Sequence, residues 1–207
     1  MSEEQETPQL YLVSPSDFDL SVFPAQLASV LDHREIACVR LSLASHDEDR
    51  ICRAADALRD VTHARDVALV IDTHFILAER LGLDGVHLND GARSVRKARS
   101  TLGADAIVGS FCGVSRHDGL SAGEAGADYI AFGPVGATSL AGAEQVEDDL
   151  FAWWSEVIEL PVVAEGGLTA ESIARLAPVT DFFAIGDEIW QSDSSTAALD
   201  ALLIGIS

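Results

Sequence analysis

The chain has 207 residues, of which 48% are hydrophobic and 23% charged, so we expect one packed domain with a substantial core. Its formal net charge of −21 repels nucleic acid and anionic membranes, and it argues against both as partners. A phosphorylated substrate would need a local cationic or dipolar pocket, whereas the acidic surface itself is typical of a soluble protein.

The ends and the cysteines place the chain in a reducing compartment. The opening MSEEQETPQ is acidic and polar, unlike a targeting peptide, and the sequence lacks a run of about eighteen apolar residues that could span a membrane. Cys38, Cys52 and Cys112 have no C-x-x-C spacing and leave one thiol unpaired. We predict a cytoplasmic protein with a flexible acidic leader over residues 1–8 and a single domain over 9–207.

Eight short apolar segments follow one another along the chain and predict strands. Most have apolar residues at both the odd and the even positions, which is typical of strands buried on both faces of a parallel sheet. They are LYLVS (10–14), IACVRLSL (36–43), VALVID (67–72), GVHL (85–88), AIVGSF (106–111), YIAFG (129–133), PVVAE (161–165) and FFAIG (182–186).

Helical patterns of about 10–15 residues separate these segments. Ser115 is the expected N-cap of one helix, Thr169 begins another that stops at Pro178, and the final helix is expected over about 187–205. The alternation predicts a single (β/α)8 TIM barrel. A doubly wound open sheet is the alternative, weakened because no G-x-G-x-x-G follows the first strand.

Ligand-binding residues of a TIM barrel lie at the carboxyl ends of its strands, which converts the strand order into candidate site positions. Those positions hold Arg40, Ser42, Asp72, Thr73, His74, Asn89, Asp90, Ser110, Arg116, Thr138, Glu165, Gly166, Gly167, Gly186 and Asp187.

The stretch AEGGLTAES predicts a phosphate site. Gly166 and Gly167 follow a buried strand and precede a helix, and Gly186 repeats the arrangement one strand later. Glycines there let backbone N–H groups approach an anion closely, and the loops after strands seven and eight commonly hold phosphate in this fold. The alternative is that the two glycines only form a tight left-handed turn.

Four stretches carry a resemblance to a known family: LYLVS, DGVHLND, GADYIAFGPV and PVVAEGGLT. Together they resemble the thiamine phosphate synthase family and its TenI relatives over nearly the whole chain. The resemblance implies a barrel that joins an aminopyrimidine diphosphate to a thiazole phosphate and releases pyrophosphate. It also implies stabilisation of the leaving diphosphate by Mg²⁺, Lys and Arg, and a homodimer.

Several positions depart from the family pattern. Its Gln-x-Arg-x-Lys on strand two becomes Arg40, Ser42 and Ala44, and its Asn-Asp after strand three becomes Asp72 and Thr73. The Gly-Gln-x-Asp after strand four is replaced by residues 89–92, and the Thr-x-Thr-Lys after strand six by residues 138–141, without the lysine.

After strand five the family serine aligns near Ser110 or Phe111. The histidine of the relatives that tautomerise the thiazole phosphate aligns near His117, after one inserted residue.

A relocated metal site is one hypothesis for these departures. Asp72 and Asp90 end adjacent strands and could hold Mg²⁺ through waters, or each could cap the segment that follows it. Arg40 inside an apolar strand calls for an anionic partner, either a substrate or Asp72. Glu165 beside the predicted phosphate loop must be paired, with Arg40 as a conceivable partner, or be protonated or act as a base.

The remaining candidates each have a structural reading. His87 lies inside a strand as a core histidine, and His74 follows Thr73, a possible helix N-cap. Arg116 and His117 are the preferred replacement for the lost positive charge. Other residues are read as packing: Cys112 as a buried thiol, and Trp153 and Trp154 as helix packing or a dimer contact.

Three functions remain open: a transferase with a remodelled diphosphate site, a non-catalytic paralogue that binds a thiazole or thiamine phosphate, and a metal-independent isomerase of a phosphorylated thiazole with Glu165 or His117 as base. Expected catalytic residues are Arg40, Glu165, Arg116 and His117. Expected substrate-binding residues are Ser42, Asp72, His74, Asn89, Ser110, Thr138, Gly166, Gly167 and Gly186.

Overall fold

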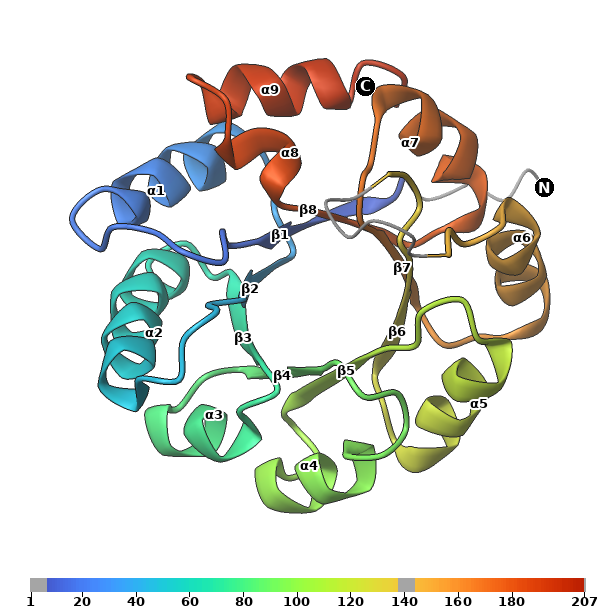
Figure 1. The fold of residues 1–207 in the computed structure, drawn as a ribbon, viewed down its shortest axis with the longest axis horizontal. Coiled ribbons are helices and arrows are strands. Elements are labelled where there is room, and N and C mark those ends of the chain that lie inside the picture. The colour runs from blue at the N-terminus through green and yellow to red at the C-terminus, as the bar shows by residue number, and fades with distance from the viewer. Residues whose placement is uncertain (1–6, 138–143, 207) are drawn as a thin grey trace.

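A closed barrel of parallel strands forms the centre of the protein (Figure 1). The computed structural model describes residues 7–137 and 144–206. Neighbours in the chain pair in parallel, and β1 pairs with β8 to close the barrel, which confirms the predicted (β/α)8 architecture. The strands are β1 (Gln9–Val13), β2 (Cys38–Leu41), β3 (Ala68–Asp72), β4 (Gly85–Leu88), β5 (Ile107–Phe111), β6 (Tyr129–Phe132), β7 (Val162–Glu165) and β8 (Phe182–Ile185).

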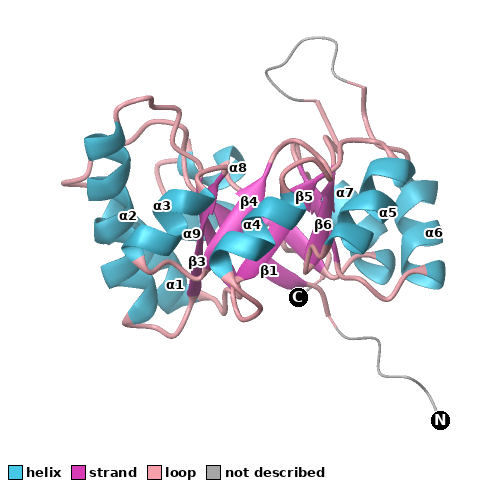
Figure 2. Cartoon of the chain, turned by 90° about the horizontal axis from the view of Figure 1, so that it is seen from below, coloured by secondary structure: helices cyan, strands magenta, loops and turns pink. Residues whose placement is uncertain are grey.

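Helices surround the barrel as an outer ring, as the views along and across its axis show (Figures 1 and 2). In the part of the chain that the structure describes, none is long and apolar enough to cross a membrane. They are α1 (Phe23–His33), α2 (Glu48–His63), α3 (Phe75–Leu81), α4 (Val95–Leu102), α5 (Arg116–Ala125), α6 (Asp148–Val157), α7 (Ala170–Leu176), the 3-10 helix η1 (Ala177–Val179), α8 (Asp187–Trp190) and α9 (Ser195–Leu202).

Two details of the predicted helices are wrong. The final helix is interrupted: α8 ends at Trp190, and Ser194 then caps α9 by accepting a hydrogen bond from the Ala197 N–H. Ser and Asp favour such caps over helix interiors because their side chains compete for backbone groups, and they fill the connecting segment here. Thr73 is not an N-cap, because its φ of 57° is left-handed and His74 occupies the cap position of α3.

Two other caps are confirmed. The Ser115 side chain accepts from the Asp118 N–H at the start of α5. Thr169 and Ser172 form a reciprocal capping box at the start of α7, so this helix is anchored directly beyond β7. Both caps fix helices that begin at the carboxyl-end face of the barrel, where the predicted site residues lie.

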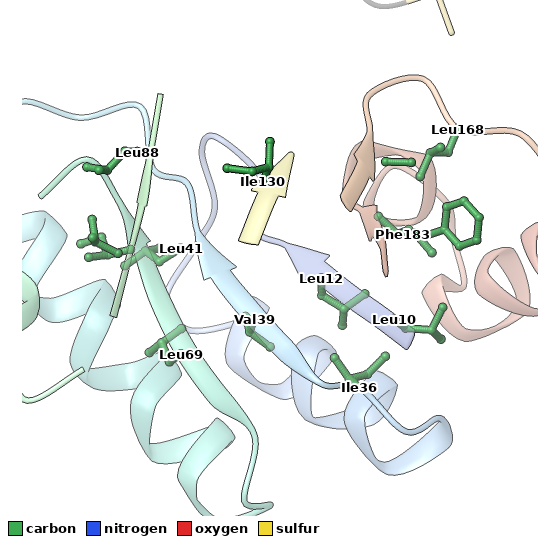
Figure 3. Close-up of a cluster of buried hydrophobic side chains, with 14 of the residues drawn as sticks. Leu10, Leu12, Ile36, Val39, Leu41, Leu69, Leu88, Ile130, Leu168 and Phe183 are labelled. Carbon is green, nitrogen blue, oxygen red and sulfur yellow. The ribbon is translucent and has the colours of Figure 1, made fainter. Parts of the chain in front are cut away.

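The strands bury both of their faces. In each strand, every second side chain points outward into the layer between barrel and helices. Leu12, Val39 and Leu69 are examples, as Figure 3 shows. The intervening side chains fill the barrel interior with a second cluster that includes Tyr11, Val70 and Val163. Because a buried Leu or Val side chain contributes roughly 1.5–3 kcal/mol, these two layers hold the strand ends in place.

A chain of polar groups crosses the barrel interior. The hydroxyls of Tyr11 and Tyr129 lie 2.7 Å apart, and the Tyr129 hydroxyl lies 2.8 Å from Nδ1 of His87. Gly109 makes room for this ring, since a Cβ there would lie 2.0 Å from Cζ of Tyr129. Burial raises the pKa of both tyrosines and lowers that of His87 well below its usual range, so the interior is neutral at this level.

His87 is therefore the core histidine that its place in the strand predicts, fully buried on β4. Its Nδ1 contacts Tyr129, whereas its buried Nε2 has no hydrogen-bond partner among the residues that the structure describes. The side chain lies in the barrel interior, below the carboxyl ends of the strands.

Candidate active site

A cavity of about 470 Å³ opens at the carboxyl ends of β1, β2, β7 and β8. Seven of the candidate site residues share it: Arg40, Ser42, Glu165, Gly166, Gly167, Gly186 and Asp187. The other lining residues are Val13, Ser14, Ser16, Ala184, Glu188 and Gln191.

Arg40 lies at the base of this cavity, with only 7% of its surface exposed. Its Nη1 donates to Oε2 of Glu165 over 2.9 Å, and its Nε lies 3.4 Å from Oδ1 of Asp72 as an ion-pair contact. Burial is the largest single effect and opposes the charged form, but the neighbouring acidic groups, led by Glu165 and including Asp72, together outweigh it and hold the pKa of Arg40 well above its usual range. Arg40 thus has carboxylate partners on β3 and β7 and also faces the cavity.

Ser42 and Ser14 join the ends of β1 and β2. The Ser42 hydroxyl donates to Oδ2 of Asp72 over 2.6 Å, while the Ser42 N–H donates to the Ser14 hydroxyl over 2.9 Å. Asp72 is therefore engaged on both oxygens, by Ser42 and by Arg40. Its side chain turns toward the mouth of the barrel.

The loop after β7 approaches the loop after β6 closely. Gly166 and Gly167 have φ values of 84° and 68°, the left-handed turn that the sequence offered as an alternative, and both also line the cavity. The Gly136 N–H donates to the Gly166 carbonyl over 2.9 Å. A Cβ on Gly136 would lie 2.1 Å from the Gly167 carbonyl oxygen, so only glycine fits this contact.

Two backbone N–H groups converge on one anion between β7 and β8. The Gly186 N–H donates to Oε2 of Glu188 over 2.8 Å, and the Leu168 N–H donates to Oε1 of the same carboxylate over 3.1 Å. We call these two N–H groups the amide cradle. Because they come from the loops after strands seven and eight, they have the position and chemistry of an anion site in this fold.

Predicted residues after β4 and β5 lie outside this cavity. Asn89 and Asp90 are exposed, and the Asp90 carboxylate accepts from the Ser94 hydroxyl over 2.6 Å. Ser110 is buried and donates to the Gly91 carbonyl over 2.8 Å, so its hydroxyl holds the loop after β4. These contacts give Ser110 and Asp90 structural partners.

His74 lines a separate cavity of about 370 Å³ beside α2 and α3, together with Thr73 and His46. His117 is exposed in the first turn of α5. Thr138, the candidate after β6, lies outside the described residues. Neither His74 nor His117 is among the described residues that line the Arg40 cavity.

Arg116 lies on the outer rim. Its Nη2 is 3.3 Å from Oδ2 of Asp149, and its guanidinium stacks 4.9 Å from the centroid of the Trp153 ring. Trp154 is buried and its Nε1 donates to the Leu160 carbonyl, which is the packing role that the sequence favoured. The homodimer stays a prediction.

The two carboxylates expected to bind Mg²⁺ each have another partner in the structure, Arg40 for Asp72 and Ser94 for Asp90. Oδ1 of Asp72 and Nε of Arg40 are both buried without a hydrogen bond in the described structure, and they face each other across the 3.4 Å ion-pair contact. The buried Asp72 oxygen is thus paired with a guanidinium cation. Within residues 7–137 and 144–206, no three His, Cys, Asp or Glu side chains are grouped so as to hold an ion.

Sequence reasoning missed Glu188, the residue that occupies the amide cradle, and did not consider Ser14 or Ser16 as lining residues. One signal was present: Asp187 and Glu188 are two consecutive acids directly after the predicted phosphate glycine Gly186. The pattern alone does not reveal that the second carboxylate turns back onto the strand-end amides.

This is a TIM barrel whose strand-end loops hold the Glu188 carboxylate on two backbone N–H groups, in the same cavity as a buried arginine. The family described as thiamine monophosphate synthase matches residues 10–186. The chain is 41% identical to the thiamine-phosphate synthase of Rhodospirillum centenum, over 92% of this chain and 93% of that protein. It is 38% identical to the thiamine-phosphate synthase of Erythrobacter litoralis, over 95% of each chain.

The chain therefore belongs to the thiamine monophosphate synthase family, which confirms the resemblance drawn from its motifs. The structure of a thiamine phosphate pyrophosphorylase from Pyrococcus furiosus supports the fold. It superposes with a TM-score of 0.81 at 22% identity, covering 96% of this chain and 95% of that one.

Proposed function

We propose that this protein is a transferase of thiamine biosynthesis that joins an aminopyrimidine diphosphate to a thiazole phosphate. A carbon–nitrogen bond forms between the pyrimidine methylene carbon and the thiazole nitrogen. The carbon–oxygen bond to the diphosphate breaks, and the diphosphate leaves with the electron pair as pyrophosphate. The family and the anion-binding end of the cavity support this assignment together.

One observation supports phosphate binding most strongly: the N–H groups of Gly186 and Leu168 converge on a single carboxylate. A carboxylate is a chemical stand-in for phosphate, since both are anions that accept hydrogen bonds through two or more oxygens. We place the thiazole phosphate monoester at this amide cradle. Gly166 and Gly167 line the same cavity.

Arg40 is the cation we assign to the diphosphate. It lies in the same cavity as the amide cradle, and its guanidinium is fixed by Glu165 and Asp72 before any ligand arrives. Donors that are fixed in advance stabilise developing charge without reorganisation, which is the main electrostatic contribution to reactions of this type. Glu165 and Asp72 are positioning residues in this scheme.

The environment we propose is the reducing cytoplasm, and the three cysteines are free thiols. Burial raises the pKa of Cys38 to about 12 and that of Cys112 to about 11, so both stay protonated near neutral pH. Neither is a nucleophile in the proposed transfer, because the thiazole nitrogen forms the new bond directly.

The direct test is product formation. Purified protein is mixed with both substrates, and thiamine phosphate and pyrophosphate are quantified separately. We expect the two products in equal amounts. The Arg40→Lys variant should lower the rate at least tenfold, because lysine keeps the charge but lacks the forked donors that contact both carboxylates. Arg175→Lys changes an exposed pair with Asp148 and serves as the matched control.

Two other results would contradict the transferase. Tight binding of the thiazole phosphate without either product would indicate a non-catalytic binding protein. Isomerisation of the thiazole phosphate in the absence of the diphosphate would indicate an isomerase, with Glu165 as the candidate base because it lines the cavity. Product formation, ligand binding and isomerisation, measured on the same protein, together separate the three functions.

A further inference from the structure

The amide cradle is occupied by a side chain of the protein itself. Glu188 extends from α8, the short helix directly after β8, and its two oxygens each accept one of the cradle N–H groups. Figure 1 shows α8 inside the outer ring, between α9 and the barrel. A ligand phosphate cannot use the same two N–H groups while this carboxylate holds them.

The charges around the cavity also oppose the binding of a phosphate. Among the described lining residues, Arg40 is the one cation, and Glu165, Asp187 and Glu188 are carboxylates. Arg40 is already paired with Glu165. A phosphate dianion therefore enters a region of negative charge, and it gains the cradle only if Glu188 releases it.

We propose that Glu188 is a tethered anion that competes with the substrate phosphate for the amide cradle and thereby sets the specificity of the site. This inference rests on the proposed function, because it assumes that the phosphate binds at the cradle. Displacement requires a ligand that offers the N–H groups more negative charge than one carboxylate. A phosphate monoester does so, whereas the corresponding unphosphorylated alcohol does not.

The carboxylate is free to leave. Glu188 is only partly buried, and its described hydrogen bonds are the two with the cradle N–H groups. Release breaks those two bonds, and an incoming phosphate replaces them. Occupation by Glu188 also satisfies the two N–H groups when no ligand is bound, so the empty site costs no unpaired buried donors.

The test is isothermal titration calorimetry with inorganic phosphate and with thiazole phosphate. It compares the wild-type chain, Glu188→Ala, Glu188→Gln and Asp187→Asn. Glu188→Ala vacates the cradle and should lower the Kd at least tenfold. Glu188→Gln keeps one acceptor oxygen without the charge, so its Kd should lie between those of Glu188→Ala and the wild type.

Asp187→Asn is the matched control. It removes the same charge from the neighbouring position, but its side chain does not occupy the cradle, so its Kd should stay within about threefold of the wild type by the screening of an exposed charge. An NMR titration follows the amide signals of Gly186 and Leu168. These signals should shift on Glu188→Ala and shift again when phosphate is added.

Equal tightening by Asp187→Asn and Glu188→Ala would overturn the inference, because it would reduce the effect to general repulsion. Wild-type phosphate binding that is unchanged in both Glu188 variants would also overturn it and would leave the proposed function intact. No binding by any variant, with unmoved cradle amide signals, would overturn both proposals. A Glu188 effect on phosphate without any transferase product would sustain the inference and refute the proposed function.

Discussion

The Nη1 atom of Arg40 lies 2.9 Å from Oε2 of Glu165, although β1 and β8 separate their strands around the barrel. The side-chain exposures of the two residues are 8% and 16%, so water screens this ion pair little. The contact crosses the mouth of the barrel and ties β2 to β7. It places a fixed positive charge in the proposed substrate cavity.

Arg40→Met should lower the free energy of unfolding by about 3 kcal/mol, because it leaves the carboxylates of Glu165 and Asp72 buried without their cation. Urea unfolding followed by circular dichroism measures this. Arg175→Met breaks the exposed pair with Asp148 and should change the stability by less than about 1 kcal/mol. Equal effects of the two substitutions would show that the Arg40 pair is as weakly coupled as a surface contact.

His87 should make the protein less stable in mild acid. Burial, followed by the charge of Arg40, holds the pKa of His87 well below its usual range, whereas the unfolded chain binds this proton near pH 6.5. The stability that depends on a neutral His87 is therefore fully present above pH 6.5 and is lost as the pH falls. Between pH 7 and 5 the wild type should lose about 1–2 kcal/mol more stability than His87→Gln. Parallel pH profiles of the two proteins would refute this assignment.

Gly136→Ala should weaken binding of thiazole phosphate about tenfold, or about 1.4 kcal/mol. Its Cβ would press on the Gly167 carbonyl and displace the loop that carries the cavity glycines. Gly113→Ala is the control, since its Cβ would meet nothing within 4 Å and costs only the strain of a positive φ of 56°. Calorimetry on both variants decides this, and equal affinities would show that the close approach does not shape the site.

Binding of thiazole phosphate should be unchanged, within about twofold, by EDTA or by added Mg²⁺, because the cradle donors are backbone N–H groups that need no metal. Asp90→Asn should likewise leave the Kd and any Mg²⁺ dependence of diphosphate binding unaltered, because the Asp90 carboxylate is engaged by Ser94. If Asp90→Asn abolishes a Mg²⁺ requirement for the diphosphate, Asp90 is a metal ligand and our reading of the site is wrong.

The fold was predictable because each strand is short, apolar on both parities and separated from the next by a helical pattern. The same reasoning placed Arg40, Glu165 and the glycines Gly166, Gly167 and Gly186 at strand ends, and the structure brings these five into one cavity. Strand order and the period-two alternation are sufficient for such positions.

Side-chain direction was not predictable at the same level. Arg40 has both a structural ion pair and a place in the cavity, two readings that the sequence treated as alternatives. Asp72 and Asp90 end neighbouring strands, yet one turns to Ser42 and the other to Ser94. Glu188 accepts from the Gly186 N–H of its own loop and from the Leu168 N–H of the loop after β7, contacts that depend on the short α8 and carry no sequence period.

The most direct test of the central claim is a crystal structure of the protein with thiazole phosphate bound. We predict the phosphate between the N–H groups of Gly186 and Leu168, with the Glu188 carboxylate turned away and Arg40 still paired with Glu165. A phosphate bound elsewhere, with Glu188 still on the cradle, would contradict the account of this site.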